Sequence, residues 1–504
     1  MQISRYVKNY DTLIASAAGF FLIYLYTRYS GIGISPASIM YTSAARSFST
    51  SGALTTFNNL PIVDFPIFYP LFLGVITFIT RIDPIVAGPV LNGLLFAIVI
   101  YLSGWLMQRF TSPSYLYKWL LLIAIVLSPS LLQIYTYLWS ETLFIFFCLV
   151  FIIAYRRYII KRTTTSLLIV AFIAAICTVT RYAGVTIIGT GGLLLLLDRN
   201  LVLKKKVTHI ILYSVTACSL LVLNLFRNAL LAKSITGPRE PSITPFSKNV
   251  YYFGTVICDW LNITEDYYYL AMPLAVIILV GICGLFAYNN LTRKTDSFEH
   301  IALTFTIIYA LFMIVSATFS RYQRLDSRLL APLFIPLLWS CTAWVTKAIK
   351  KLRFYKVKNA VAWSAFALVI LIFSYNQLYA DMDRYNDQSE YGNPGYTDDT
   401  WNKSPFVNFL KHNTHIYKPG IPIYSDAYEA VYFASEVQAK LLPHRFFTKN
   451  IAKFYAVKHY YLVWFKDLEN PELINLNDVL QHHKLVKLYD FEDGTIYEYD
   501  SSKQ

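Results

Sequence analysis

Two carboxylic acids stand where hydrophobic runs of this chain end, and both are candidates for acid–base chemistry. Asp64 lies in the aromatic, proline-rich segment PIVDFPIFYPLF, and Glu141 follows Trp139 and Ser140 at the start of a hydrophobic run. A carboxylate held beside apolar surface can acquire a raised pKa and act as a general base. Glu141 equally suits simple stabilisation of a helix start, because the helix dipole favours an acid there.

A set of arginines at similar positions suits the binding of phosphate. Its members are Arg181, Arg227, Arg239, Arg321, Arg324 and Arg328. The guanidinium fork matches two phosphate oxygens and keeps its charge at any relevant pH. The alternatives are snorkelling to lipid headgroups for Arg181 and local ion pairing around Asp326. With Asp326, three tyrosines complete the predicted substrate pocket: Tyr41, Tyr69 and Tyr182.

Composition places these side chains in a membrane protein. The chain has 504 residues, 56% of them hydrophobic, and several runs approach the roughly 20 apolar residues that cross a bilayer. Residues 380–504 hold 13 Lys and Arg and 18 Asp and Glu, a net charge of −5. This leaves 31 basic and 12 acidic residues, a net charge of +19, before position 380. Topology and anionic lipid explain that basic excess better than nucleic acid does.

The hydrophobic runs predict about 11–13 membrane spans, with eleven as the preferred count. The eleven are 12–29, 86–107, 117–137, 141–156, 164–180, 182–198, 206–227, 268–288, 299–318, 328–347 and 360–377. The short apolar stretch 66–80 is interpreted as re-entrant or interfacial, since every later Lys/Arg cluster then falls on the cytoplasmic side. The N-terminus is then cytoplasmic, and the candidate acids and arginines collect on the outer face.

The predicted fold is mainly α-helical with two domains. Residues 1–379 form a transmembrane domain whose first outer loop, 30–85, carries juxtamembrane helices. One of these helices is expected to start after Ser35 and Pro36 and to end at Gly52. Residues 380–504 form a small extracytoplasmic α/β domain, with strand-like or mixed segments at 421–435 and 458–465 and helical spacing at 400–413.

No cofactor is predicted with certainty. The six cysteines show neither the paired spacing of a metal site nor a disulfide framework, and five of them lie in apolar runs. A divalent cation stays possible. The sequence contains no phosphate-binding loop, dinucleotide fingerprint or nucleophile elbow.

Several motifs together resemble a known family. The pattern SP-x-S-x-x-Y-x-x-A-A from Ser35, a following glycine and PIVDFPIFYP are similar to the first outer loop of GT-C glycosyltransferases. Four more segments fit: LSPSLLQIYTYLWSETLFIF at 127–146, TRYAG at 180–184, LFRNALLAKSITGPREPS at 225–242 and RLDSRLLAPLFIPLL at 324–338. The resemblance covers most of the chain. It implies a polytopic enzyme that uses polyprenyl-phosphate sugars, as protein mannosyltransferases and the lipid A aminoarabinose transferase do.

The resemblance has one departure. The family usually carries a catalytic aspartate in the first-loop helix, about where Ala37 stands here, and alanine cannot accept a proton. Either Asp64 or Glu141 takes the role, or the protein is a non-catalytic binder or transport component with the same fold. A secondary transporter is disfavoured, because such proteins place ionisable residues near the bilayer midplane.

The resulting hypothesis is an inverting glycosyltransferase of the bacterial plasma membrane. It would transfer a sugar from a polyprenyl-phosphate donor to a lipid, glycan or protein hydroxyl on the extracytoplasmic face. Asp64 or Glu141 would be the base, and the arginines would hold the donor phosphate, whose charge grows in the transition state.

Overall fold

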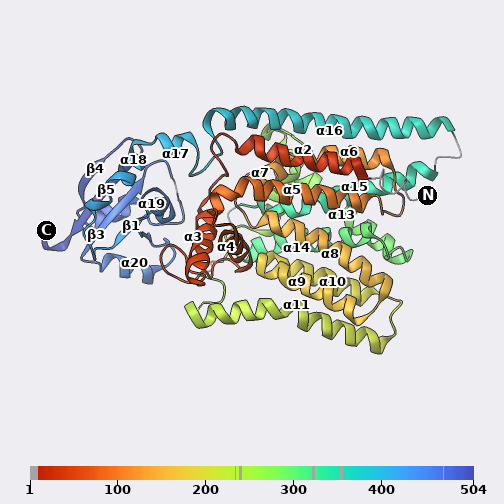
Figure 1. Cartoon of the computed structure of the whole chain (residues 1–504), viewed down its shortest axis with the longest axis horizontal. Coiled ribbons are helices and arrows are strands. Elements are labelled where there is room, and N and C mark those ends of the chain that lie inside the picture. Colours follow the sequence, from red (N-terminus) through yellow and green to blue (C-terminus); the bar gives the residue numbers. More distant parts are fainter. Residues whose placement is uncertain are drawn as a thin grey trace.

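The computed structural model describes residues 9–232, 234–237, 241–320, 324–351, 356–468 and 470–503. A long bundle of roughly parallel helices forms most of the molecule, and a small sheet domain lies at one end of the bundle (Figure 1). The predicted mainly helical fold with a C-terminal α/β domain is confirmed. Two of the predicted phosphate-binding residues, Arg239 and Arg321, lie outside the described residues.

Each of the eleven predicted spans is helical. The helices are α2 (Tyr10–Thr27), α5 (Pro84–Met107), α6 (Tyr115–Val126) with α7 (Pro129–Tyr135), α8 (Glu141–Lys161), α9 (Thr164–Thr180), α10 (Val185–Leu197), α11 (Leu203–Ala232), α13 (Ala271–Leu291), α14 (Phe298–Phe319), α15 (Ser327–Lys351) and α16 (Lys356–Tyr391). Among the described residues, seven helices are long and apolar enough to cross a membrane. The bent pair α6–α7 makes eight. The other three predicted spans fall on α2, α9 and α10, which are not among the helices long and apolar enough to cross.

The break between α6 and α7 follows from local sequence. Pro129 is the first residue of α7, where its missing N–H costs nothing, and the Ser128 side chain accepts a hydrogen bond from the backbone N–H of Leu131. The two helices meet at an angle of 54°. After this bend, residues 136–140 and Glu141, the first residue of α8, lie at the end of the bundle that faces the sheet domain.

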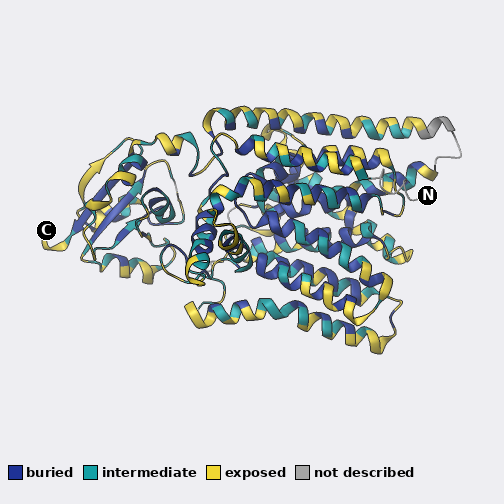
Figure 2. Ribbon diagram, viewed as in Figure 1, coloured by how far each residue is buried: buried dark blue, intermediate teal, exposed yellow. Residues whose placement is uncertain are grey.

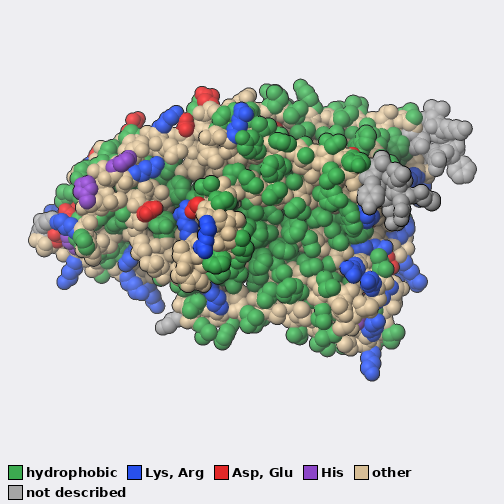
Figure 3. Space-filling model, in the orientation of Figure 1, with side chains coloured by type: hydrophobic (Ala, Val, Ile, Leu, Met, Phe, Trp, Pro, Cys, Tyr) green, Lys and Arg blue, Asp and Glu red, His purple; other side chains and the backbone are tan. Residues whose placement is uncertain are grey.

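The outside of the bundle is that of an integral membrane protein. Large hydrophobic side chains such as Val222, Ile277 and Leu368 are more than half exposed, whereas the centre of the bundle is buried (Figure 2). Hydrophobic side chains cover a broad band of the visible face (Figure 3). Lys and Arg gather at the end of the bundle farthest from the sheet domain. A hydrocarbon environment explains the band, because water would disfavour so much contiguous apolar surface.

Segment 30–85, predicted as the first outer loop, lies across the end of the bundle, between the bundle and the sheet domain (Figure 1). Its helix α3 (Pro36–Ser51) starts at a capping box in which Ser35 and Ser38 each accept from the other's backbone N–H, and it ends at Gly52, whose φ is +75°. Helix α4 (Phe68–Thr80) has 13 residues and packs against α3. At about 1.5 Å per residue it is too short to cross a roughly 30 Å hydrocarbon core.

The C-terminal domain is a five-stranded mixed sheet with short helices. The strands are β1 (Ile423–Ser425), β2 (Lys440–Leu441), β3 (His459–Phe465), β4 (Val486–Asp490) and β5 (Gly494–Asp500), in the order β2-β1-β3-β5-β4. The helices are α17 (Asp399–Lys403), α18 (Pro405–His412), α19 (Tyr428–Ser435), α20 (Thr448–Tyr455) and α21 (Leu476–His482). Strand β1 is parallel to both neighbours, and the other pairs are antiparallel.

Aromatic contacts fix this domain onto the first outer loop. The ring of Tyr432 in α19 stacks on Phe57 at a centroid distance of 4.4 Å. The Tyr428 hydroxyl lies 3.8 Å from the sulfur of Met40 in α3. On the other side, the Tyr137 hydroxyl donates to the carbonyl oxygen of Pro394. The domain therefore covers the bundle end where the candidate residues collect.

Candidate functional site

Glu141, Arg181 and Arg328 form one buried ionic cluster, called here the Glu141 cluster. Glu141 is 0% exposed, and its two carboxylate oxygens are divided between the arginines. Oε2 lies 2.5 Å from Nη1 of Arg181, and Oε1 lies 2.7 Å from Nε of Arg328. Two guanidinium groups against one carboxylate leave an excess of one positive charge within the cluster, and the nearby Asp326 carboxylate also interacts with these three groups.

The ends of three helices bring the cluster together. Glu141 is the first residue of α8, Arg181 directly follows α9, and Arg328 is the second residue of α15. The start of α8, the end of α9 and the start of α15 lie at the same side of the bundle, so the charged residues there meet. The sequence predicts that Glu141, Arg181 and Arg328 lie at one face of the bundle, and the structure brings these three residues together there.

Hydroxyl and aromatic side chains surround the cluster. The hydroxyl oxygen of Ser140 accepts from Arg181 at 3.2 Å and lies 3.3 Å from the Tyr41 hydroxyl. The guanidinium of Arg328 lies 4.0 Å from the centroid of the Trp139 ring. Burial raises the pKa of Tyr41, so this phenol stays protonated and can donate a hydrogen bond. Tyr69 packs edge-on against Tyr41 at 5.0 Å.

Asp64 lies one residue from this aromatic group, on the exposed side. The ring of Phe65 packs on Tyr41 at 4.9 Å, and the neighbouring Asp64 is exposed. Two bonds hold the segment, because Tyr182 donates to the carbonyl of Val63 and Arg227 donates to that of Ile62. Tyr182 and Arg227, predicted as ligand-binding, therefore hold the Asp64 segment in place through its backbone.

Gly237 packs directly on the Asp64 carboxylate. A Cβ atom added at position 237 would lie 1.8 Å from Oδ1 of Asp64, and the φ of Gly237 is +75°. Only glycine tolerates both conditions. Backbone from the loop between α11 and α12 (Phe246–Trp260) thus occupies one side of this carboxylate.

Arg324 and Asp326 lie just before α15 and have different partners. Arg324 donates to the Thr255 hydroxyl at 3.2 Å, and its guanidinium lies 4.7 Å from the centroid of the Tyr252 ring. The Asp326 carboxylate accepts from the backbone N–H of Leu329 at 2.9 Å, which stabilises the first turn of α15. Burial raises the pKa of Asp326.

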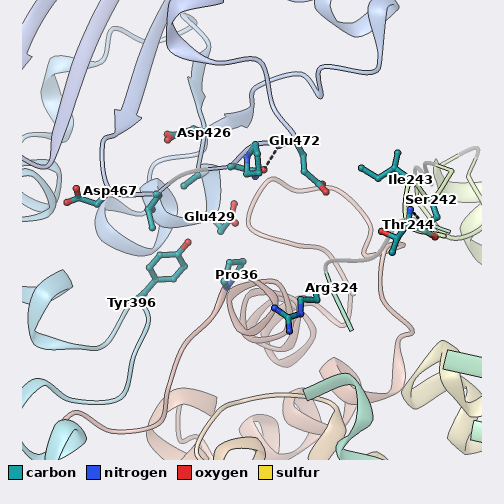
Figure 4. A pocket seen from close by; sticks show the side chains of 14 residues that line it. Pro36, Ser242, Ile243, Thr244, Arg324, Tyr396, Asp426, Glu429, Asp467 and Glu472 are labelled. Carbon is teal, nitrogen blue, oxygen red and sulfur yellow. Dashed lines mark hydrogen bonds between the residues drawn. The ribbon is translucent and has the colours of Figure 1, made fainter. Parts of the chain in front are cut away.

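A pocket of about 630 Å³ lies between the C-terminal domain and the start of α3 (Figure 4). Its charged lining residues are Arg324, Asp426, Glu429, Asp467 and Glu472. Of these, the sequence analysis identified only Arg324. Asp426 had one usable signal: it directly follows the parallel strand β1, and polar groups at the carboxyl ends of parallel strands often line sites.

Metal ligation finds no support within the described parts of the chain. No group of three or more His, Cys, Asp or Glu side chains there is arranged to hold an ion.

Comparison of the chain with protein-family models and with characterised proteins by sequence gives no match. Solved structures do match in fold. ArnT from Cupriavidus metallidurans in the apo state superposes over 100% of this chain and 99% of its own, with a TM-score of 0.55 and 12% identity. ArnT bound to undecaprenyl phosphate matches over 96% of each chain at the same TM-score and 10% identity.

The archaeal oligosaccharyltransferase AglB from Archaeoglobus fulgidus, in complex with an inhibitory peptide and a dolichol-phosphate, is a third match. It covers 92% of this chain and 70% of its own, with a TM-score of 0.55 and 12% identity. The chain therefore has the GT-C fold, a polytopic helical bundle with a C-terminal sheet domain, as the sequence resemblance predicts.

Proposed function

We propose that this protein is a membrane glycosyltransferase that transfers a sugar from a polyprenyl-phosphate donor to a hydroxyl of a lipid, glycan or protein. The observation that supports it best is the Glu141 cluster, a buried group with an excess of one positive charge. A phosphodiester carries one negative charge and matches that excess. The fold is shared with a protein whose structure holds undecaprenyl phosphate.

Asp64 is the better candidate for the base. Both oxygens of Glu141 are engaged by guanidinium groups, so protonating it would disrupt two ion pairs. Asp64 is exposed and lies in a segment held rigid by Tyr182 and Arg227. In the proposed roles, Glu141 positions the two arginines and Asp64 accepts the proton.

The proposed reaction is a single displacement with inversion. Asp64 takes the proton of the acceptor hydroxyl while the hydroxyl oxygen attacks the anomeric carbon. The bond between this carbon and the phosphate oxygen breaks, and its electron pair stays on the phosphate. Arg181, Arg324 and Arg328 stabilise the second negative charge that develops on the leaving group.

The proposed location is the bacterial plasma membrane, with the N-terminus cytoplasmic and the C-terminal domain extracytoplasmic. Lys and Arg gather at the bundle end opposite the C-terminal domain, which supports this orientation under the positive-inside bias. The proposed partners are then a polyprenyl-phosphate sugar, an acceptor at the outer surface and the surrounding lipids, with no nucleic acid.

An Asp64→Asn variant tests the proposal. We expect at least a roughly 100-fold loss of transfer, because removal of a general base typically costs 10² to 10⁴ in rate. Asparagine keeps the shape of the side chain, and thermal unfolding measured in parallel separates a loss of transfer from a loss of fold. The assay follows release of polyprenyl phosphate from a panel of labelled polyprenyl-phosphate sugars by protein in nanodiscs. Asp266→Asn, another exposed carboxylate, is the control.

Full transfer by Asp64→Asn would exclude Asp64 as the base. Ala37 lies in the first turn of α3, about where the family that the sequence resembles usually carries an aspartate. It favours a second candidate function, a non-catalytic binder of polyprenyl phosphate. Tight binding without turnover across the whole panel would support that alternative. Failure to bind undecaprenyl phosphate at all would contradict both.

A further inference from the structure

The pocket beneath the C-terminal domain has walls of opposite charge. One wall comes from the C-terminal domain and carries four acids: Asp426, Glu429, Asp467 and Glu472. The other comes from the membrane domain and carries Arg324 and the start of α3 at Pro36. In Figure 4, Glu429 lies between Tyr396 and Glu472, and Pro36 and Arg324 lie across the cavity.

Two of these acids, Asp426 and Glu429, each have a buried oxygen without a hydrogen-bond partner among the described residues. Asp426 is 4% exposed; its Oδ1 accepts from the backbone N–H of Phe465 and from the Ser425 hydroxyl, both at 3.2 Å. Its Oδ2 has no hydrogen-bond partner among the described residues, and neither has Oε2 of Glu429. A buried carboxylate oxygen left unpaired is costly and calls for a donor from outside the chain.

The raised pKa values of Asp426 and Glu429 suit hydrogen bonding to hydroxyl groups of a ligand. Burial raises the pKa of Asp426 to about 7 and that of Glu429 to about 7. The charged groups that face them are Arg324, Asp467 and Glu472, with Tyr396 beside Glu429. Near neutral pH each acid can therefore accept or donate a hydrogen bond, and a hydroxyl group can do the same in return.

We propose that this pocket binds the acceptor, and that it selects a hydroxyl-bearing group without negative charge through Asp426 and Glu429. The identification of the ligand as the acceptor rests on the proposed function above. A phosphate or carboxylate on the ligand would meet four acids on one wall, and like charges in a partly buried site repel strongly. The arginine wall leaves the donor phosphate on the opposite side of the cavity.

Photolabelling of the full chain in nanodiscs tests this inference without donor or turnover. The probes are an alkyl maltoside bearing a diazirine and the matched glycoside whose terminal sugar is a uronic acid. The readout is labelling of the tryptic peptide His412–Lys440, which contains Asp426 and Glu429. We expect the neutral probe to label it about tenfold or more above the uronate, because a like charge placed beside these acids weakens binding by at least that factor.

The double variant Asp426→Asn with Glu429→Gln should reduce that ratio to within about threefold, because the repulsion is removed while the shape is kept. Glu436→Gln, an exposed carboxylate at the end of α19 outside the pocket, should leave the ratio unchanged. Three results would each overturn the inference: equal labelling by the uronate, an unchanged ratio in the double variant, or no labelling of this peptide by either probe.

The outcomes also separate this inference from the proposed function. Selective labelling by a protein that transfers no sugar would keep the pocket assignment and reject the enzymatic role. Transfer of sugar by a protein whose pocket shows no selectivity would keep the enzymatic role and reject the pocket assignment.

Discussion

Glu141 and Asp426 are both buried carboxylates, and their surroundings differ. Glu141 is contacted on both oxygens by guanidinium groups from other helices, so its charge is compensated within the protein. Asp426 has one oxygen bonded to its own domain and one without a partner among the described residues. A carboxylate paired on both oxygens, such as Glu141, positions the groups around it. An oxygen without a partner, such as Oδ2 of Asp426, is available to a ligand.

Glu141→Gln should have the largest effect on the first region. It leaves Arg181 and Arg328 facing one another in a buried space without their shared anion. Breaking a buried pair in this way typically costs about 3–5 kcal/mol. Thermal unfolding of the variant should show a clear loss of stability, while Glu265→Gln, an exposed acid near α13, should show none. A variant as stable as the parent would mean that the cluster is not internally compensated.

Arg324→Gln should affect ligand binding more than folding. Arg324 contacts Thr255 and Tyr252 and has no role in compensating Glu141. Loss of one charge-assisted hydrogen bond to phosphate should weaken binding of undecaprenyl phosphate by about tenfold. Titration by native mass spectrometry measures this, with the exposed Arg199→Gln as control. Unchanged affinity would remove Arg324 from the phosphate site.

Asp426→Asn should have the smallest effect, and its sign depends on pH. The pKa of Asp426 is raised to about 7 in the folded state from an ordinary value near 4, so the folded protein binds the proton more tightly. Stability from this group is then full below pH 4 and is lost as pH rises towards 7. Asparagine carries no charge to desolvate, so the variant should match or exceed the parent by about 1 kcal/mol at pH 8.

Thermal unfolding of the full chain at pH 5 and pH 8 distinguishes an Asp426 carboxylate with a raised pKa from one that is well paired. At pH 5 the parent should recover most of its deficit relative to the variant. An equal loss of stability at both pH values would show that the Asp426 carboxylate is well paired in solution. It would also place Asp426 in the same class as Glu141.

The helices were predictable because each depends on a local hydrophobic run. Alternation of spans places Glu141, Arg181 and Arg328 on one face, and the structure has them in contact. Sequence could not tell which arginine reaches which acid, since that depends on how helix ends pack in three dimensions. Arg227 and Tyr182 show the limit: the sequence predicts that they contact ligand, and it gives no sign of the hydrogen bonds that they make to the backbone carbonyls of residues 62 and 63.

Asp426 and Glu429 could not be recognised for a related reason. Their segment IPIYSDAYEAVYFAS has the composition of an ordinary small-domain core. Only the docking of α19 on α3 turns Tyr428 towards Met40 and leaves Glu429 lining a pocket. Such a site depends on contact between two domains, which no pattern within either segment encodes.

The close approach of Gly237 to Asp64 ties the position of this carboxylate to a loop that carries no charge at that point. A methyl group at position 237 would overlap Oδ1 of Asp64, and the positive φ there is strained for any residue but glycine. Gly237→Ala should therefore displace either the loop or the carboxylate, and so disturb transfer without altering any ionisable residue.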